Sequence, residues 1–237
     1  MSPKPDGSFR LFRVAGIDVY LHWMWFLVAY LQIVERPNAY SSLGWNVAEY
    51  VCLFGIVLLH EFGHSFATRQ VGGTADTILL WPLGGVAYVR PPQRPGAELW
   101  SIAAGPLVNV VLFVLLAGVL SSTLLDAQSR DVQLLIKNVA WINGGLLFFN
   151  LLPVYPLDGG QILRSLLWFA FGPVRSLLYA TALGLFGIVA LVWWFLDWRT
   201  LALNTRTIWT LVIAAYLFSG CWAAFQRARA SRAEEVP

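Results

Sequence analysis

The chain has 237 residues, of which 58% are hydrophobic and only 12% are charged, and its formal net charge is +3. A soluble globular domain is closer to half apolar and a quarter charged, so this composition excludes an ordinary soluble protein and indicates a polytopic membrane protein. No basic cluster with interleaved aromatic side chains is present. We therefore expect the lipid bilayer among the partners and no nucleic acid.

The N-terminal part of the chain predicts two strands and then a membrane span. The segment "SFRLFRVAGIDVYL" (8–21) partly alternates apolar and polar residues and is split by Gly16, a pattern typical of two short strands. Residues 19–34 are apolar and roughly as long as a bilayer requires, so we expect the first transmembrane helix there.

A second span and a further pair of strands follow. Residues 47–69 form a long apolar run that is interrupted by the motif "HEFGH" (60–64). Ionisable groups at such depth need a partner or a function. After this span, "TADTILLWPLGGVAYVR" (74–90) gives two short β-rich runs around Pro82 and a Gly-Gly pair. We expect all these strands to form a small β-sheet at the cytoplasmic membrane face.

Four more spans complete a mainly α fold of about six transmembrane helices; they are predicted over 98–122, 134–171, 175–197 and 206–226. The fourth span is broken at "NLLPVYPLDGG" (150–160), where prolines and glycines cannot continue a helix. Irregular backbone at membrane depth persists only where it is buried in protein or lines a wet cavity, so this break indicates a site. We expect residues 227–237 to form a charged, frayed tail.

The lysine and arginine residues predict the orientation in the membrane. With both termini in the cytoplasm, the inside segments hold more of these residues than the outside segments do, which is the distribution that membrane proteins favour. In this topology His60, His64 and the break in the fourth span all lie toward the cytoplasmic ends of their helices. They can therefore reach the same depth.

The "HEFGH" motif has the spacing of a metal site. His60 and His64 are four residues apart, so on a helix they lie on one face, one turn apart, and can point two ring nitrogens at one ion. Glu61 lies beside them and can accept a proton from an attacking water. A catalytic zinc ion usually takes three protein ligands, so a third ligand is required. The alternative is a pair of packed histidines bonded to helix carbonyls.

Asp158 is the candidate for the third ligand. It lies in the broken span, at the matching depth, next to a Gly-Gly pair that lets the backbone approach closely. Glu49 is on the same helix as the histidines but roughly 17 Å from His60, at 1.5 Å of rise per residue. That distance excludes Glu49 as a ligand of the same ion.

The other acidic and histidine residues are weaker candidates. Asp76 and Glu98 lie in or beside the predicted cytoplasmic loop, and we interpret them as solvated charges. His22 enters the first span from the correct side, but its neighbours Trp23 and Trp25 favour a role in the interfacial aromatic belt.

Together these motifs resemble the site-2 protease family of intramembrane zinc metalloproteases. The resemblance rests on "HEFGH" (60–64), "PLGGVA" (82–87), "AAGPLVN" (103–109) and "NLLPVYPLDGG" (150–160), which occur in the family's order. It implies a single domain over residues 1–226 with one zinc ion per chain. The residues that it implies for the site are His60, His64 and Asp158 as metal ligands and Glu61 as the catalytic acid/base.

The resemblance also implies how a substrate is held. Asn150 matches a family asparagine proposed to steady the substrate or the oxyanion; a structural role, bonding carbonyls freed at the helix break, is the open alternative. The "PLGGVA" strands are expected to receive an unwound substrate. Expected substrates are single-span transmembrane proteins, such as an anti-sigma factor or a transcription-factor precursor, in a prokaryotic cell membrane. An oligomer is left open.

Two other functions could use the same residues. A polytopic zinc transporter or sensor would bind metal without turnover, but it needs a polar path onward from Asp158, and no string of intramembrane carboxylates follows in the sequence. A catalytically inactive relative acting as a scaffold would lack a motif residue, and none is missing. The predicted function is therefore an intramembrane zinc metalloprotease.

Overall fold

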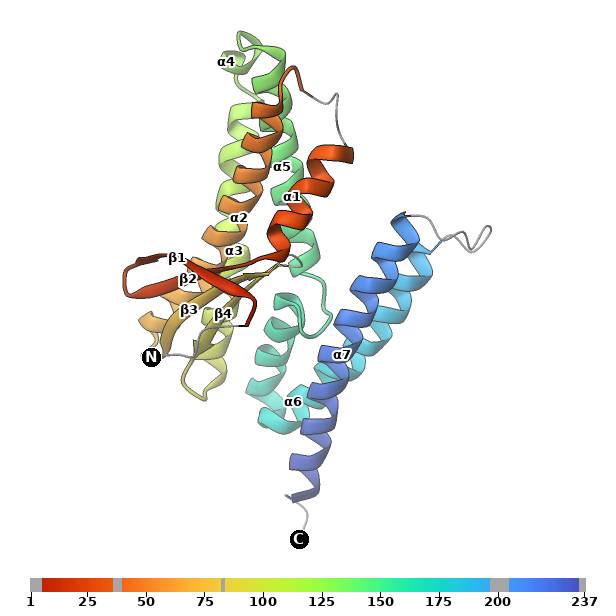
Figure 1. The fold of residues 1–237 in the computed structure, drawn as a ribbon. Helices are drawn as coiled ribbons and strands as arrows, with labels where there is room; N and C mark the ends of the chain where they lie inside the picture. The colour runs from red at the N-terminus through yellow and green to blue at the C-terminus, as the bar shows by residue number, and fades with distance from the viewer. Residues whose placement is uncertain (1–5, 36–39, 82–83, 197–204, 235–237) are drawn as a thin grey trace. The chain divides into compact units, whose positions relative to one another are not determined.

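The computed structural model describes residues 6–35, 40–81, 84–196 and 205–234. These residues are mostly helical and include a small sheet (Figure 1), which confirms the predicted mainly α fold. The chain divides into two compact units. The first contains residues 1–92 and 103–148, and the second contains residues 93–102 and 149–237.

The first unit contains a four-stranded sheet in the order β1-β2-β3-β4. Its strands are β1 (Ser8–Val14), β2 (Ile17–His22), β3 (Thr74–Trp81) and β4 (Gly84–Arg90). The first two strands form the expected pair around Gly16, β2 runs parallel to β3, and β3 pairs antiparallel with β4. Both predicted strand regions are confirmed and join into one sheet. Pro82 lies outside the described residues.

The first unit also contains helices, one of which packs on this sheet. They are α1 (Met24–Glu35), α2 (Leu43–Gln70), the part of α3 (Pro95–Leu120) from residue 103 onward, α4 (Thr123–Asp126) and α5 (Arg130–Asn150) up to residue 148. The sheet lies against α2 (Figure 1). Alternate residues of β2, Ile17 and Val19, are fully buried in one cluster with Ile78 and Leu80 of β3 and with Val57 of α2. Burial of this apolar face holds the sheet on the helix.

The expected first span over 19–34 is only partly helical. Its first residues belong to β2, and α1 has 12 residues. The physical reason is that the partial alternation noted over 8–21 continues to His22. The backbone of β2 also pairs with β1 on one edge and with β3 on the other. Five described helices are long and apolar enough to cross a membrane, namely α2, α3, α5, α6 and α7.

The second unit contains a pair of long helices, α6 (Asp158–Phe195) and α7 (Thr205–Glu234). Gly172, with φ 77° and ψ 172°, breaks α6 into two helical halves, and α7 runs alongside the later half (Figure 1). A core of Val154, Ile188, Ala214, Leu217 and Cys221 joins these elements. The prediction of a frayed tail is wrong for residues 227–234, which continue α7 because arginine and alanine are strong helix formers.

Candidate metal centre

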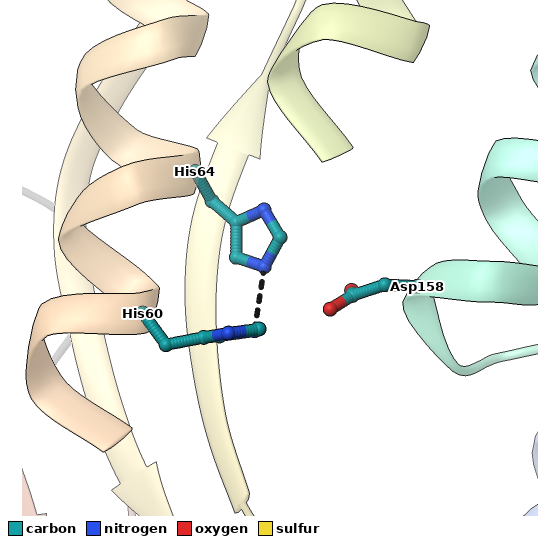
Figure 2. A group of neighbouring side chains, drawn as sticks. All are labelled: His60, His64 and Asp158. Carbon is teal, nitrogen blue, oxygen red and sulfur yellow. Dashed lines mark hydrogen bonds between the residues drawn. The ribbon is translucent and has the colours of Figure 1, made fainter. Parts of the chain in front are cut away.

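Two histidines of α2 face each other one helical turn apart. His60 and His64 are 3% and 6% exposed, and their rings turn to the same side of the helix (Figure 2). Their Nε2 atoms lie 3.0 Å apart. Two nitrogens bound to one tetrahedral zinc ion at about 2.0–2.1 Å are separated by about 3.3 Å. The pair therefore fits a zinc ion by donor type and by spacing.

Hydrogen bonds behind His60 determine which of its nitrogens carries the proton. Asn109 Nδ2 donates to Asn143 Oδ1 at 2.8 Å, and Asn143 Nδ2 donates to the Asn109 carbonyl at 2.9 Å. Because its amide nitrogen is used in this way, Asn109 turns Oδ1 toward Nδ1 of His60, 2.5 Å away. Nδ1 must then be the donor, which leaves the lone pair on Nε2, the atom that faces His64.

Glu61 projects from α2 to the outer strand of the sheet. The side chain is 5% exposed, and its Oε2 accepts a hydrogen bond from the backbone N–H of Ala87 at 2.9 Å. Ala87 is in β4, the last strand in the sheet order, opposite Ile78 of β3. Since its N–H bonds to Glu61, the carboxylate lies beside the edge of β4 that β3 does not occupy.

Two glycines allow backbone to approach these side chains. A Cβ on Gly105 of α3 would lie 2.3 Å from Nε2 of His64 and 2.9 Å from Nε2 of His60. A Cβ on Gly85 of β4 would lie 2.2 Å from Cγ of Glu61. Side chains do not make contacts this short, so both positions require glycine while the histidines and the glutamate keep these places.

The predicted break in the fourth span is present in the second unit. The helix α5 ends at Asn150, and α6 begins at Asp158. A Cβ on Gly159 would lie 2.3 Å from the carbonyl oxygen of Leu151, so the first turn of α6 packs directly on the backbone of the break. The structure thus brings His60 and His64 together in the first unit and places Asn150 and Asp158 at the two ends of the break in the second.

The rival candidate His22 is part of the sheet. It is 7% exposed, so the interpretation as an interfacial belt residue is wrong. Its ring contacts that of Trp81 with centroids 4.1 Å apart, and its Nδ1 accepts a hydrogen bond from the N–H of Met24 at 3.3 Å. These contacts explain the burial of His22 by packing.

The acidic residues considered as alternatives to Asp158 either bind other side chains or are exposed to solvent. Glu49 accepts hydrogen bonds from the Tyr40 hydroxyl at 2.5 Å and from the Asn138 amide at 2.7 Å. The side chain of Asp76 is 68% exposed, as expected. Glu98 was expected to be solvated, and this expectation is wrong.

Glu98 is buried in the second unit and forms an ion pair with Arg164. It is 8% exposed, and its Oε2 lies 2.9 Å from Arg164 Nη1. The pair joins the first turn of α3 to α6. The sequence places the two residues 66 positions apart, so nothing local could reveal the partner that removes Glu98 from water.

Sequence reasoning also missed Asn109 and Asn143 as partners of the site. Both are fully buried. A signal was available, because an amide side chain inside an apolar span usually faces protein rather than lipid. This rule could have identified Asn109 and Asn143 as residues that face protein. It could not have predicted the hydrogen bond between Asn109 and His60.

The chain is similar to known zinc metalloproteases. The model of peptidase family M50 matches residues 48–127 and 125–193. A zinc metalloprotease of Methanocaldococcus jannaschii is 34% identical over 181 residues, which cover 75% of this chain and 50% of that protein. Stage IV sporulation protein FB of Bacillus subtilis is 34% identical over 115 residues, which cover 48% of this chain and 38% of that protein. The chain thus spans half or less of the length of these two relatives.

A solved structure shares the fold. The site-2 protease from Methanocaldococcus jannaschii aligns with a TM-score of 0.61 at 27% sequence identity, over 92% of this chain and 95% of that chain. The alignment spans nearly all of both chains, so the similarity is not confined to a single motif.

Proposed function

The chain belongs to peptidase family M50, the site-2 protease family of zinc metalloproteases, and we propose that it hydrolyses a peptide bond within or near the transmembrane segment of a membrane-protein substrate. The observation that carries the proposal is the buried pair of His60 and His64 beside Glu61 on a helix apolar enough to cross a membrane. The protein is a multi-pass membrane protein. We propose that both of its termini are cytoplasmic and that it resides in a prokaryotic cell membrane.

Three residues are proposed to hold one zinc ion per chain. His60 and His64 each offer Nε2, and Asp158 offers a carboxylate oxygen. Support for Asp158 comes from its place in the break of an apolar span, and from the engagement of Glu49 and Glu98 with other partners. When bound, zinc supplies Lewis-acid chemistry: it makes a water molecule acidic enough to ionise near neutral pH, and it polarises the scissile carbonyl.

Glu61 is proposed as the general acid/base. It takes a proton from the water whose oxygen adds to the carbonyl carbon, and it then gives this proton to the leaving nitrogen as the C–N bond breaks. The hydrogen bond from the Ala87 N–H holds the carboxylate at the edge of β4. The pair of His60 and Asn109 keeps the histidine lone pair on the side of the reaction.

The edge of β4 is proposed to receive the substrate. A transmembrane helix must open its own hydrogen bonds before a carbonyl can be attacked, and pairing with a strand edge replaces them. The carboxylate of Glu61 lies beside that edge. A substrate strand added to β4 would therefore pass next to the catalytic base. Single-span proteins, such as an anti-sigma factor or a transcription-factor precursor, are the proposed substrates.

Two further roles complete the proposal. Asn150, at the end of α5, is proposed to donate to the developing oxyanion, with its structural role in the helix break as the alternative. Residues 1–226 are proposed to act as a single metalloprotease domain, to which both compact units contribute.

Co-expression identifies the substrate and tests the proposal. Candidate single-span membrane proteins with tags at both ends are expressed with the wild type or with a Glu61→Gln variant. We expect a shortened product with the wild type and the intact protein with the variant. If both proteins yield the same products from every candidate, this chain is not the protease that cuts them.

A further inference from the structure

A basic cavity of about 720 Å³ lies between α6 and α7, away from the break that carries Asp158. Three arginines and several apolar or aromatic side chains line it, among them Arg175, Arg229, Arg232, Leu178, Tyr179 and Phe225. Sites for small organic ligands commonly have volumes of about 300–1,000 Å³. The cavity is therefore large enough for a lipid headgroup.

The arginines of the cavity come from α6, after its break, and from the end of α7. Because Gly172 is not helical, a new helix starts after it, and Arg175 lies in its first turn. This helix packs on α7 through a hydrogen bond that Cys221 Sγ donates to the Thr181 carbonyl at 3.2 Å. Since both the start of this helix and the end of α7 line the cavity, Arg175 and Arg229 border the same cavity although 54 positions separate them in the sequence.

The cavity is positively charged. Among the side chains that the structure describes, which end at Arg232, no carboxylate lines the cavity or pairs with any of its three arginines. The guanidinium carbon of Arg229 lies 6.0 Å from the ring centroid of Phe225, which supports the side chain against the apolar wall. Like charges gathered in this way repel each other, and an anion between them relieves the repulsion. A guanidinium group often binds a phosphate group through two parallel N–H···O hydrogen bonds. A phosphate group is therefore the anion that matches this cavity.

The apolar wall favours a lipid over a soluble anion. Leu178, Tyr179 and Phe225 line the same cavity, and both helices are apolar enough to cross a membrane. A free phosphate gains nothing from such a wall, whereas the glycerol and acyl groups of a phospholipid bury apolar surface on it. Basic pockets between transmembrane helices near the membrane surface bind anionic headgroups for this reason.

We propose that this cavity binds an anionic glycerophospholipid, with its phosphate between the arginines and its acyl chains along α6 and α7. The bound lipid stabilises the pair of helices. This proposal does not depend on the proposed proteolytic activity, because no residue of the cavity belongs to the candidate metal centre.

Thermal unfolding of the full chain in a neutral detergent tests this proposal. The ligands are dioctanoyl phosphatidylglycerol, dioctanoyl phosphatidylcholine and inorganic phosphate, each titrated separately. The variants are Arg175→Gln, Arg229→Gln and, as a matched control, Arg227→Gln. Arg227 is also an exposed arginine near the end of α7, but it does not line the cavity, and its Nε donates to the Ala223 carbonyl.

We expect phosphatidylglycerol to raise the Tm of the wild type and of Arg227→Gln, with the other two ligands much weaker. Each cavity variant should lower the apparent affinity for phosphatidylglycerol roughly tenfold or more, because it removes a charge-assisted contact. An equal loss in Arg227→Gln would mean diffuse surface charge and would overturn the proposal. An equal response to phosphatidylcholine, an equal response to phosphate, or no response of the wild type would also overturn it. A variant that fails to fold is replaced by the corresponding Arg→Lys substitution, which should weaken binding less than Gln.

Discussion

The Nδ1 atom of His60 lies 2.5 Å from Oδ1 of Asn109, so a side chain of α3 orients a histidine of α2. Asn143 of α5 holds Asn109 in turn: its Oδ1 accepts a hydrogen bond from the Asn109 side-chain amide at 2.8 Å, and its Nδ2 donates to the Asn109 backbone carbonyl at 2.9 Å. Three helices of the first unit thus fix the tautomer of one imidazole. The chain of contacts from Asn143 through Asn109 to His60 gives the first prediction.

Replacing Asn109 with leucine should weaken zinc binding. Without its acceptor, the His60 ring can rotate or move its proton to Nε2, and partners of metal-binding histidines typically contribute 10–100-fold in affinity. Competition with a chromophoric chelator measures the dissociation constant. Asn138→Leu is the matched control, because Asn138 is also an asparagine of the first unit but bonds to Tyr40 and Glu49. Equal zinc affinities for Asn109→Leu and the wild type would remove Asn109 from the site.

Replacing Gly85 with alanine should lower turnover without removing zinc. The new Cβ would overlap Cγ of Glu61, which is 2.2 Å away, so the carboxylate must move, whereas the histidines are untouched. A displacement of about 1 Å at a catalytic group can lower the rate by on the order of 10²-fold. Cleavage rate and zinc content are measured on the same preparation, with Val86→Ala as the control. Loss of zinc in step with activity would indicate a general collapse of the site instead.

Replacing Asp158 with alanine should strip most of the zinc and abolish cleavage, while His22→Ala should retain the metal. A catalytic zinc ion commonly has three protein ligands, and the loss of one leaves only the histidine pair. The ring of His22 packs on Trp81, so its loss affects the sheet. Measuring the zinc content of the two purified variants decides whether Asp158 or His22 is the third ligand. The reverse pattern would make His22 the third ligand.

Cysteine labelling should find both termini in the cytoplasm. In a background without Cys52 and Cys221, single cysteines are placed in the 126–131 and 90–96 segments. An impermeant reagent should label the first from outside the cell and the second only after permeabilisation, as the lysine and arginine distribution predicts. External labelling of the 90–96 segment would invert the topology.

Local patterns made much of this structure predictable. The partial alternation in 8–21 and the β-rich runs in 74–90 predicted β1 to β4. Prolines with the Gly-Gly pair predicted the break between the helix end at Asn150 and the helix start at Asp158. The spacing of His60 and His64 put both rings on one side of α2 (Figure 2). Each of these features depends on residues within a few positions of one another.

Features set by distant residues were not predictable. Glu98 is removed from water by Arg164, and Asn109 meets His60 from 49 positions away. The boundary between β2 and α1 depended on pairing with β3, more than 50 positions away in sequence, which turned part of an apolar run into a strand. A single sequence gives residue types and local periodicity, and these contacts require the tertiary fold.

The most direct test of the account is the cleavage rate of a zinc-loaded Glu61→Gln variant on a purified single-span substrate in lipid. Glutamine keeps the size of the side chain but cannot take a proton from water, and general acid/base groups contribute roughly 10²–10⁴-fold. The account predicts a zinc content equal to that of the wild type and a rate lower by at least that range. A zinc-loaded variant that cuts the substrate at the wild-type rate would contradict the assignment of Glu61 and the mechanism built on it.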